Sequence, residues 1–186
     1  LWSITREDSS TGPLVPTSLQ NLVLDHIRRF NWLYVVKHRQ AKTSTAVASA
    51  LHGHCKLKRG QRGIVIAEKE ATALEVFSRI VMADDKLPPQ LRRGPARTTK
   101  ATGTYLETEG GSHISVVTGG GNNPAIGHSP DFLHITEYWE VENYVNFNRS
   151  VFPAVTKRPN SHVVIETTPG PYHSDAHRTW LNALNG

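Results

Sequence analysis

The fold is decided by the stretch Val35-Val36-Lys37-His38-Arg39-Gln40-Ala41-Lys42-Thr43, in which an apolar run leads into a Lys-Thr pair that opens a helical pattern. This arrangement is typical of a phosphate-binding loop, where backbone N–H groups and a helix N-terminus surround the phosphates. The Lys of such a loop contacts the β and γ oxygens, and the Thr hydroxyl binds Mg²⁺. The places of the two usual glycines hold Val36 and Ala41 here. A strand followed by a helix with a solvated Lys is the alternative, and the rest of the chain must decide.

The sequence on both sides of this loop alternates between helical and strand patterns. Apolar side chains recur at helical spacing in residues 18–30, 43–51, 70–82 and 174–184. Short apolar runs predict strands at residues 31–37, 63–67, 103–107, 113–118, 132–135 and 163–165. This alternation is typical of an α/β fold with a mainly parallel central sheet and helices on both faces. Because residues 1–18 are polar and rich in turn residues, we expect an N-terminal arm followed by one domain over residues 19–186.

Composition narrows the class of protein. The 186 residues suit one sizeable core, and 21 Lys and Arg against 16 Asp and Glu give a net charge of +5. That charge suits contact with a polyanion, although an ordinary basic surface explains it equally well. The single cysteine, Cys55, excludes an internal disulfide, and histidines such as His134 show no metal-ligand spacing with it. We find neither a membrane-length apolar run nor a signal-peptide pattern, so we expect a soluble, intracellular protein.

Three of the predicted strands end on residues suited to phosphate chemistry. In an open parallel sheet, ligands bind at the carboxyl ends of the strands. The first strand ends in the loop, the strand at 132–135 ends on Thr136-Glu137, and the strand at 163–165 leads to the hydroxyls of Thr167-Thr168. The Glu137 carboxylate is suited to accept the proton of an attacking water, whereas a lone acid there would simply favour a helix N-terminus. Three matched strand ends in chain order favour the catalytic interpretation.

These segments resemble a known family. Four parts of the chain resemble, in order, the motifs of the ATPase domain of tailed-phage large terminase subunits, the DNA-packaging motors. They are Gln20, the loop at 37–43, the segment 133–137 and the segment 165–170. The Arg39-Gln40 pair is the most specific feature, because that family characteristically lacks the first Gly and carries Arg-Gln instead. The resemblance implies a P-loop NTPase fold of the class with an additional strand and a catalytic glutamate. It also implies that the family's C-terminal nuclease domain is missing from this chain, and the start at Leu1 likewise suggests a piece of a longer protein.

The resemblance implies roles for the matched residues. Lys42 would neutralise the β and γ phosphates, Thr43 would coordinate Mg²⁺, and Glu137 would orient and deprotonate the water. Arg39 would contact the γ-phosphate in cis, a task suited to an always-charged guanidinium. Gln20 would read adenine, although helix capping or a surface position is an alternative for this residue. The ATP-binding residues would be Gln20, Lys37, His38, Arg39, Gln40, Ala41, Lys42, Thr43 and Ser44, and the residues coupling hydrolysis to movement would be Thr167 and Thr168.

The chain also departs from the family pattern. Ala41 replaces the second Gly of the loop, and we expect its Cβ to crowd a backbone that requires positive φ. Thr136 replaces the acidic neighbour of the glutamate, as in some branches of the family, and would hold Mg²⁺ through a water more weakly than a carboxylate does. Ile126-Gly127 stands where some relatives present an Arg finger to the neighbouring subunit, which leaves Arg149 and Arg158 as candidates.

A basic connection is the candidate DNA contact. Residues 86–100 show no regular periodicity and carry Arg92, Arg93, Arg97 and Lys100. Packaging must work on any sequence, so phosphate contacts without base readout would suffice. A solvated linker is an equal alternative.

The leading hypothesis is an ATP-hydrolysing motor domain that uses Mg²⁺ and drives double-stranded DNA into a procapsid. Its partners would be the DNA, the small terminase subunit and further copies of itself in a ring, expected to be a pentamer, on the portal protein. It would act in the host cytoplasm without membrane contact. One alternative is a fragment of a helicase-type DNA-dependent ATPase, which would need a second motor domain. Another is a degenerate P-loop domain that binds DNA or a partner without hydrolysis, a hypothesis motivated by Ala41 and Thr136.

Overall fold

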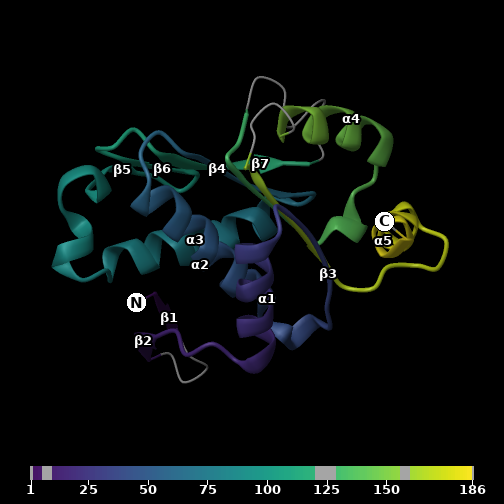
Figure 1. Ribbon diagram of the computed structural model, residues 1–186, viewed down its shortest axis with the longest axis horizontal. Helices are drawn as coiled ribbons and strands as arrows, with labels where there is room; N and C mark the ends of the chain where they lie inside the picture. The colour runs from purple at the N-terminus through teal and green to yellow at the C-terminus, as the bar shows by residue number, and fades with distance from the viewer. Residues whose placement is uncertain (1, 6–9, 120–128, 156–159, 186) are drawn as a thin grey trace.

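The computed structural model describes residues 2–5, 10–119, 129–155 and 160–185. Its centre is a seven-stranded sheet in the order β3-β9-β8-β4-β7-β6-β5 (Figure 1). The strands are β3 (Trp32–Val36), β4 (Arg62–Ala67), β5 (Thr98–Ala101), β6 (Tyr105–Thr108), β7 (His113–Thr118), β8 (Phe132–Thr136) and β9 (His162–Thr167). The run from β3 to β7 is parallel, and antiparallel β6 and β5 complete one edge. The predicted α/β fold with a mainly parallel sheet is confirmed.

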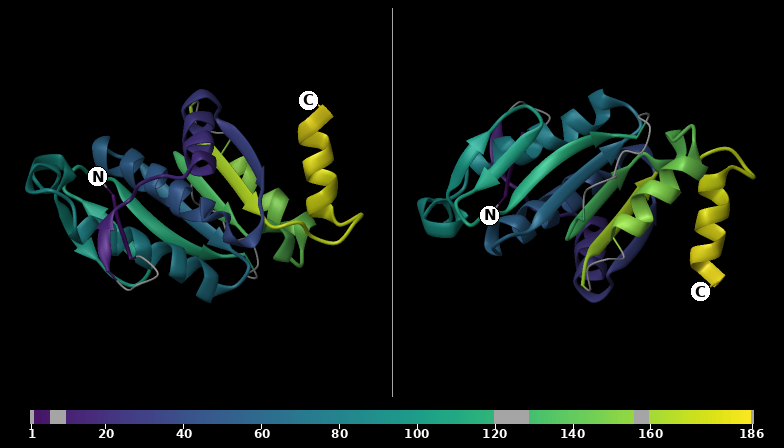
Figure 2. Two further views of the ribbon diagram at one scale, coloured as in Figure 1. Left: turned by 90° about the horizontal axis from the view of Figure 1, so that it is seen from below. Right: turned by 90° about the horizontal axis from the view of Figure 1, so that it is seen from above.

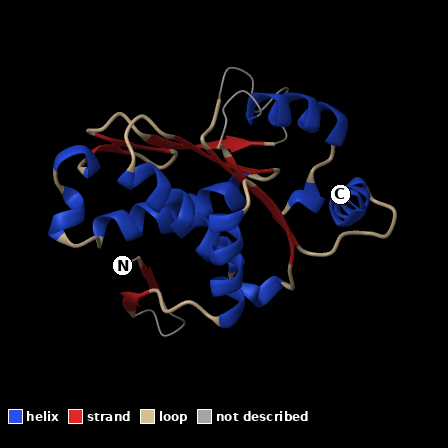
Figure 3. Cartoon of the chain, viewed as in Figure 1, coloured by secondary structure: helices blue, strands red, loops and turns tan. Residues whose placement is uncertain are grey.

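Helices cover both faces of the sheet, as predicted. One face carries α1 (Ser18–Arg29), α2 (Thr43–Leu57) and α3 (Glu70–Asp85), and the other carries α4 (Tyr144–Val155) (Figures 1 and 3). The last helix, α5 (Asp175–Asn185), packs beside α4's layer through Ala176. Each face therefore has its own apolar core, one centred on α2 and α3 and one on α4.

Burial on both faces explains the strand sequences. All five side chains of β8 are buried, so the strand has a nearly continuous apolar sequence instead of an alternating one. On α2, the small side chains of Ala46 and Ala48 are fully buried, which lets the helix approach the sheet closely. On α3, Val76, Phe77 and Ile80 form the buried face that the helical spacing predicted.

Two segments differ from the sequence-based prediction. Helix α4 was not predicted, because Pro153 lies inside it and asparagines interrupt its apolar pattern; buried Phe147 and Val151 hold it against the sheet. The basic connection is also more regular than expected. It forms short 3-10 turns at Pro89–Arg92 and Gly94–Ala96 and then the edge strand β5, paired with β6.

The N-terminal arm folds back on the domain. Strand β1 (Ser3–Thr5) pairs with β2 (Thr11–Pro13) in a separate two-stranded sheet. Trp2 is buried, and its indole Nε1 donates to His52 Nδ1 on α2 at 2.9 Å. Figure 2 shows this arm and α5 at opposite ends of the molecule. Within the described ranges, each helix is too short or too polar to cross a membrane.

Candidate functional site

The three polar strand ends singled out in the sequence lie next to one another. Strands β3, β9 and β8 are neighbours in the sheet, with Val36 paired to Thr167 and Glu166 paired to Thr136. Because these strands are parallel, their carboxyl ends meet at one edge. The loop, Thr136-Glu137 and Thr167-Thr168 therefore form one site, which we call the strand-end site.

The loop runs from β3 through a 3-10 turn, Arg39–Ala41, into α2. The predicted crowding at Ala41 is wrong: in the described part of the chain, the positive φ near this turn, 53°, belongs to Lys42. Ala41 is buried in the 3-10 turn, where a Cβ is tolerated. Lys42 caps α2 with an exposed side chain, and Thr43 opens the helix fully buried.

Several side chains of the loop are exposed, whereas the buried Gln20 contacts the backbone of the loop from α1. His38, Arg39 and Gln40 are exposed, and Ser44 is half-buried. The buried Gln20 amide donates through Nε2 to Lys42 O at 2.8 Å. Its Oε1 accepts from Thr17 N at 3.0 Å in a capping box at the start of α1. Gln20 thus has the helix-capping contact that was named as an alternative to adenine recognition.

The Glu137 carboxylate is held from two sides. The Lys37 ammonium, almost fully buried, contacts Glu137 Oε1 at 2.8 Å, and the Thr168 hydroxyl donates to Oε2 at 3.2 Å. Glu137 itself has φ 50°, a costly conformation for a residue with a side chain. Among the described residues it makes no side-chain capping bond to the 3-10 turn Tyr138–Glu140 that follows. The carboxylate therefore contacts residues that directly follow two neighbouring strands, β3 and β9.

Thr167 connects the same edge to the segment after β8. Its hydroxyl accepts a hydrogen bond from Trp139 N at 3.0 Å and donates to Thr168 O at 2.9 Å. Together with the Thr168 contact to Glu137, these bonds tie the end of β9 to the segment that carries the glutamate.

Glu166 is the residue of this site that sequence reasoning missed. It is fully buried, and its Oε2 accepts from the Thr43 hydroxyl at 2.7 Å. Its Oε1 accepts from Thr136 Oγ1 and from His134 Nε2, each at 3.0 Å. Burial alone would raise the pKa of Glu166, but the hydrogen bond and charge of His134, together with Lys37, lower it to about 2. The available signal was a charged residue inside an apolar strand, which must find partners when buried.

The candidate DNA-contact residues lie elsewhere. They belong to the basic connection and to β5, at the edge of the sheet opposite β3. Two backbone hydrogen bonds, from Gly60 N to Gly110 O and from Gly110 N to Pro95 O, join this connection to the residues that precede β4. Arg97 Nε contacts Glu109 Oε2 at 2.9 Å, with both side chains exposed. Arg92 donates to Asp85 O, and Lys100 lies over the Tyr105 ring. Arg93 is exposed. The structure therefore separates this basic group from the strand-end site.

The candidates for an arginine finger are only partly visible. Arg149 is exposed on α4. Arg158 and the Ile126-Gly127 pair lie outside the described residues.

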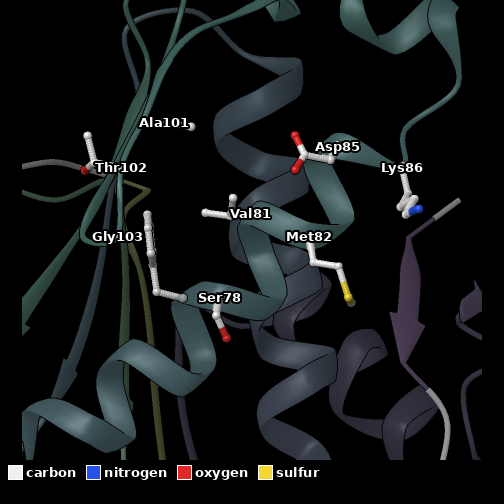
Figure 4. Close-up of a pocket in the computed structure, with 9 residues that line it drawn as sticks. Ser78, Val81, Met82, Asp85, Lys86, Ala101, Thr102 and Gly103 are labelled. Carbon is white, nitrogen blue, oxygen red and sulfur yellow. The ribbon is translucent and has the colours of Figure 1, made fainter. Parts of the chain in front are cut away.

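A pocket of about 490 Å³ lies away from the strand-end site. Helix α3 lines one side with Val81 and Met82, and the end of β5 lines the other with Ala101 and Thr102 (Figure 4). It contains none of the predicted site residues. We therefore locate the candidate site by its side-chain chemistry.

Comparison with known proteins identifies solved structures with a similar fold. No protein-family model and no curated protein matches the sequence. The structure of the HK97 bacteriophage large terminase matches with a TM-score of 0.75 and 14% identity, over 93% of this chain and 37% of that one. A mutant ATPase domain of the Thermus phage P74-26 large terminase matches with a TM-score of 0.71 and 16% identity, over 90% and 70%.

A large terminase from a thermophilic bacteriophage also matches, with a TM-score of 0.70 and 13% identity, over 92% of this chain and 44% of that one. The chain thus spans less than half the length of this protein and of the HK97 terminase. Identities this low carry the fold and not the chemistry. At that level the resemblance found in the motifs is confirmed: this chain has the fold of the ATPase domain of phage large terminases.

Proposed function

We propose that the chain is a P-loop ATPase domain, of the class with an additional strand and a catalytic glutamate, and that it serves as the motor domain of a large terminase. The observation that carries the proposal is the position of the Glu137 carboxylate. The carboxylate is partly exposed at the carboxyl edge of the sheet, where β3 leads into the loop. Contacts with Lys37, which follows β3, and with Thr168, which follows β9, hold it there. A structural acid would need neither this exposure nor a backbone with positive φ.

The phosphates would bind at the N-terminus of α2. The first N–H groups of a helix have no partner within the helix, so they are available to an anion. Lys42 stands at this end with its side chain exposed, and Arg39 is exposed one 3-10 turn earlier. We assign Lys42 to the β and γ phosphates and Arg39 to the γ-phosphate. Gln20 would support the loop through Lys42 O.

The oxygen donors beside this helix end fit Mg²⁺. Thr43 supplies a hydroxyl, and Glu166 supplies a hard carboxylate in contact with it. Mg²⁺ is usually bound through one or two protein ligands together with the phosphates of the substrate, so the ion would arrive with the nucleotide. When bound, Mg²⁺ would neutralise charge that develops on the phosphates.

Glu137 would orient the attacking water and accept its proton. Lys37 is suited to keep that carboxylate in place, since its ammonium contacts one oxygen and leaves the other to Thr168. A movement of Glu137 on loss of the γ-phosphate would then be transmitted through Thr168 and Thr167 to the end of β9. This is a route by which hydrolysis could be coupled to movement.

The larger assembly is also part of the proposal. Several copies of the domain would form a ring on the portal protein, with the small terminase subunit and double-stranded DNA as further partners, in the host cytoplasm. Arg149, exposed on α4, is available to a neighbouring subunit. Because such a ring completes its site across subunit boundaries, we expect slow turnover in dilute solution and faster turnover at higher protein concentration.

Nucleotide binding by variants at the two ends of α2 tests the proposal. Lys42 and Lys58 cap the same helix at its N- and C-terminal ends, and both are exposed. Lys42→Ala should weaken Mg-ATP binding at least tenfold in calorimetry, whereas Lys58→Ala should leave it unchanged. A folded wild-type sample that binds no Mg-ATP at millimolar concentration would overturn the proposal. Equal binding by Lys42→Ala and wild type would overturn it as well.

A further inference from the structure

Glu166 places a carboxylate where the acid missing at position 136 would have lain. Thr136 and Glu166 are direct partners in the parallel pairing of β8 with β9. Side chains of paired residues project from the same face of a sheet, so these two occupy adjoining space. The contact between Thr136 Oγ1 and Glu166 Oε1, 3.0 Å, shows that they meet. A longer acid on one strand can therefore reach the space of a shorter acid on the other.

The second oxygen of Glu166 contacts the loop. The Thr43 hydroxyl donates to Glu166 Oε2 at 2.7 Å, the short distance typical of a hydroxyl bonded to a carboxylate. Both side chains are fully buried, so bulk water does not compete for this bond. Thr43 is the residue that the proposed function assigns to Mg²⁺. The bond therefore links the carboxylate directly to the proposed metal ligand.

The other contacts fix the carboxylate in this orientation. His134 Nε2 and Thr136 Oγ1 both donate to Oε1, which leaves Oε2 to Thr43. A buried carboxylate without such partners would cost several kcal/mol, so the hydrogen bonds from β8 account for its tolerance inside the sheet. They do not by themselves require a bond to the first residue of α2. That additional bond points to a role at the loop.

We propose that Glu166 takes over the task of the missing acid: it orients the Thr43 hydroxyl and supplies the negative charge that favours Mg²⁺ beside the nucleotide. Thr136 then acts only as a hydrogen-bond partner of Glu166. The inference rests on the proposed ATPase function. Glu166 is a positioning residue in this scheme, because it acts through Thr43.

A charge-relocation experiment on the 186-residue chain tests this inference. Binding of a fluorescent, non-hydrolysable ATP analogue is measured in EDTA and over a Mg²⁺ titration, with folding checked by circular dichroism and thermal melting. Glu166→Gln should keep the affinity found in EDTA and lose at least tenfold of the gain that Mg²⁺ provides. The double variant Thr136→Asp with Glu166→Gln should recover most of this gain, because it returns one carboxylate to the same level of the sheet.

Two further variants complete the test. Thr136→Val removes the neighbouring hydroxyl but keeps the carboxylate and its bond to Thr43, so it should lose less of the Mg²⁺ gain than Glu166→Gln does. Glu166→Asp keeps the buried charge, and thus the fold if Glu166→Gln is unstable, but shortens its reach to Thr43. It should lose part of the Mg²⁺ gain.

The outcomes separate the two proposals. If wild type gains affinity from Mg²⁺ and both Glu166→Asp and Glu166→Gln gain as much, the inference fails while the ATPase proposal stands. A double variant no better than a folded Glu166→Gln also overturns it. If wild type binds no nucleotide with or without Mg²⁺, the proposed function itself fails.

Discussion

Two buried charged clusters of this molecule have similar chemistry but opposite surroundings. The strand-end cluster joins the carboxyl ends of three strands to the loop, and its members are Lys37, Thr43, Glu137, Glu166 and Thr168. The arm cluster joins the N-terminal arm to α2, α3 and β5, and its members are Trp2, His52, Lys56, Asp84 and Thr98. Each contains an acid held by several donors.

The arm cluster is closed. Asp84 accepts from His52 Nε2 at 2.9 Å, pairs with buried Lys56 and accepts from the Thr98 hydroxyl. His52 Nδ1 accepts from Trp2 Nε1, so this ring links the N-terminal arm to Asp84. Every donor in this chain of bonds has an acceptor within the cluster. Such an arrangement holds the arm, α2, α3 and β5 together.

The strand-end cluster is open on one side. The Glu137 side chain remains 23% exposed, and the loop residues beside it are exposed as well. Both clusters contain buried charge, so buried charge alone does not identify a candidate site. The position at the strand ends is what distinguishes the candidate site from a structural network. Substitutions in the first should change nucleotide chemistry, and those in the second should change stability.

The largest expected effect is the loss of hydrolysis in Glu137→Gln. A general base contributes about 10²–10⁴-fold to a rate, so phosphate release should fall by about that factor while ATP binding is retained. The control is Glu140→Gln, on the same 3-10 turn, which pairs with Lys69 at 3.1 Å. It should retain most of the activity. Loss of ATP binding in Glu137→Gln would instead make Glu137 a structural residue like Asp84.

The next effect is on stability, in Asp84→Asn. Removing this charge leaves Lys56 buried without its anion, which should cost about 3–5 kcal/mol of unfolding free energy in urea titrations. Asp85→Asn, at the exposed neighbour, is the matched control and should change stability by less than about 0.5 kcal/mol. Nucleotide affinity of the folded protein should be unchanged in both. A selective loss of affinity in Asp84→Asn would remove the distinction between the clusters.

A smaller effect is expected from pH. Burial alone would raise the pKa of Asp84, but hydrogen bonds from His52, Lys56 and Thr98 lower it from 3.8 to about 2. A depressed pKa stabilises the folded state above the unfolded value, and this contribution is lost as the pH falls from about 4 towards 2. Unfolding free energy should therefore decline over that range in wild type and less steeply in Asp84→Asn. Identical pH profiles would show that Asp84 does not carry this charge in the folded state.

The smallest effect concerns the basic connection, far from both strand ends and the exposed loop. Replacing Arg92, Arg93 and Arg97 together by Gln should weaken DNA binding and flatten its salt slope by about 0.9 for every phosphate that is no longer neutralised. The effect should be modest because Arg97 is already paired with Glu109. A triple replacement at Arg28, Arg29 and Lys58, all exposed, controls for net charge. Fluorescence anisotropy against NaCl concentration measures both, and equal slopes would assign the connection to solvent.

Much of the fold could be predicted because apolar periodicity reports burial directly. The run before Thr136-Glu137 is apolar since β8 is covered on both faces, and the small residues after Thr43 mark a helix that packs closely on the sheet. Helix α4 could not be found in this way. Its intrinsic helix preference is weak, with Pro153 inside it, and its stability comes from packing that the local sequence does not reveal.

The conformation of the loop lies between these cases. A phosphate-binding loop was predicted from Arg39-Gln40 and Lys42-Thr43, with the residue in the left-handed conformation at the place of the missing glycine. The 3-10 turn shifts that conformation to Lys42, so Ala41 needs no special freedom. Which residue of the turn is left-handed depends on how α2 packs on the domain. Gln20 helps to fix the start of α2 through its hydrogen bond to Lys42 O.

The sequence by itself determined which chemical groups stand at the carboxyl edge, because the residue that ends an apolar run is a local property and parallel strands end on the same side. Only the tertiary structure decided which of these groups are partners. Lys37 contacts Glu137 because only one strand, β9, lies between β3 and β8 in the sheet. Glu166 contacts Thr43 because β9 brings its side chain to the start of α2. Strand order is set by packing between distant segments, and a hydrogen bond forms only between atoms that this order brings within about 3 Å.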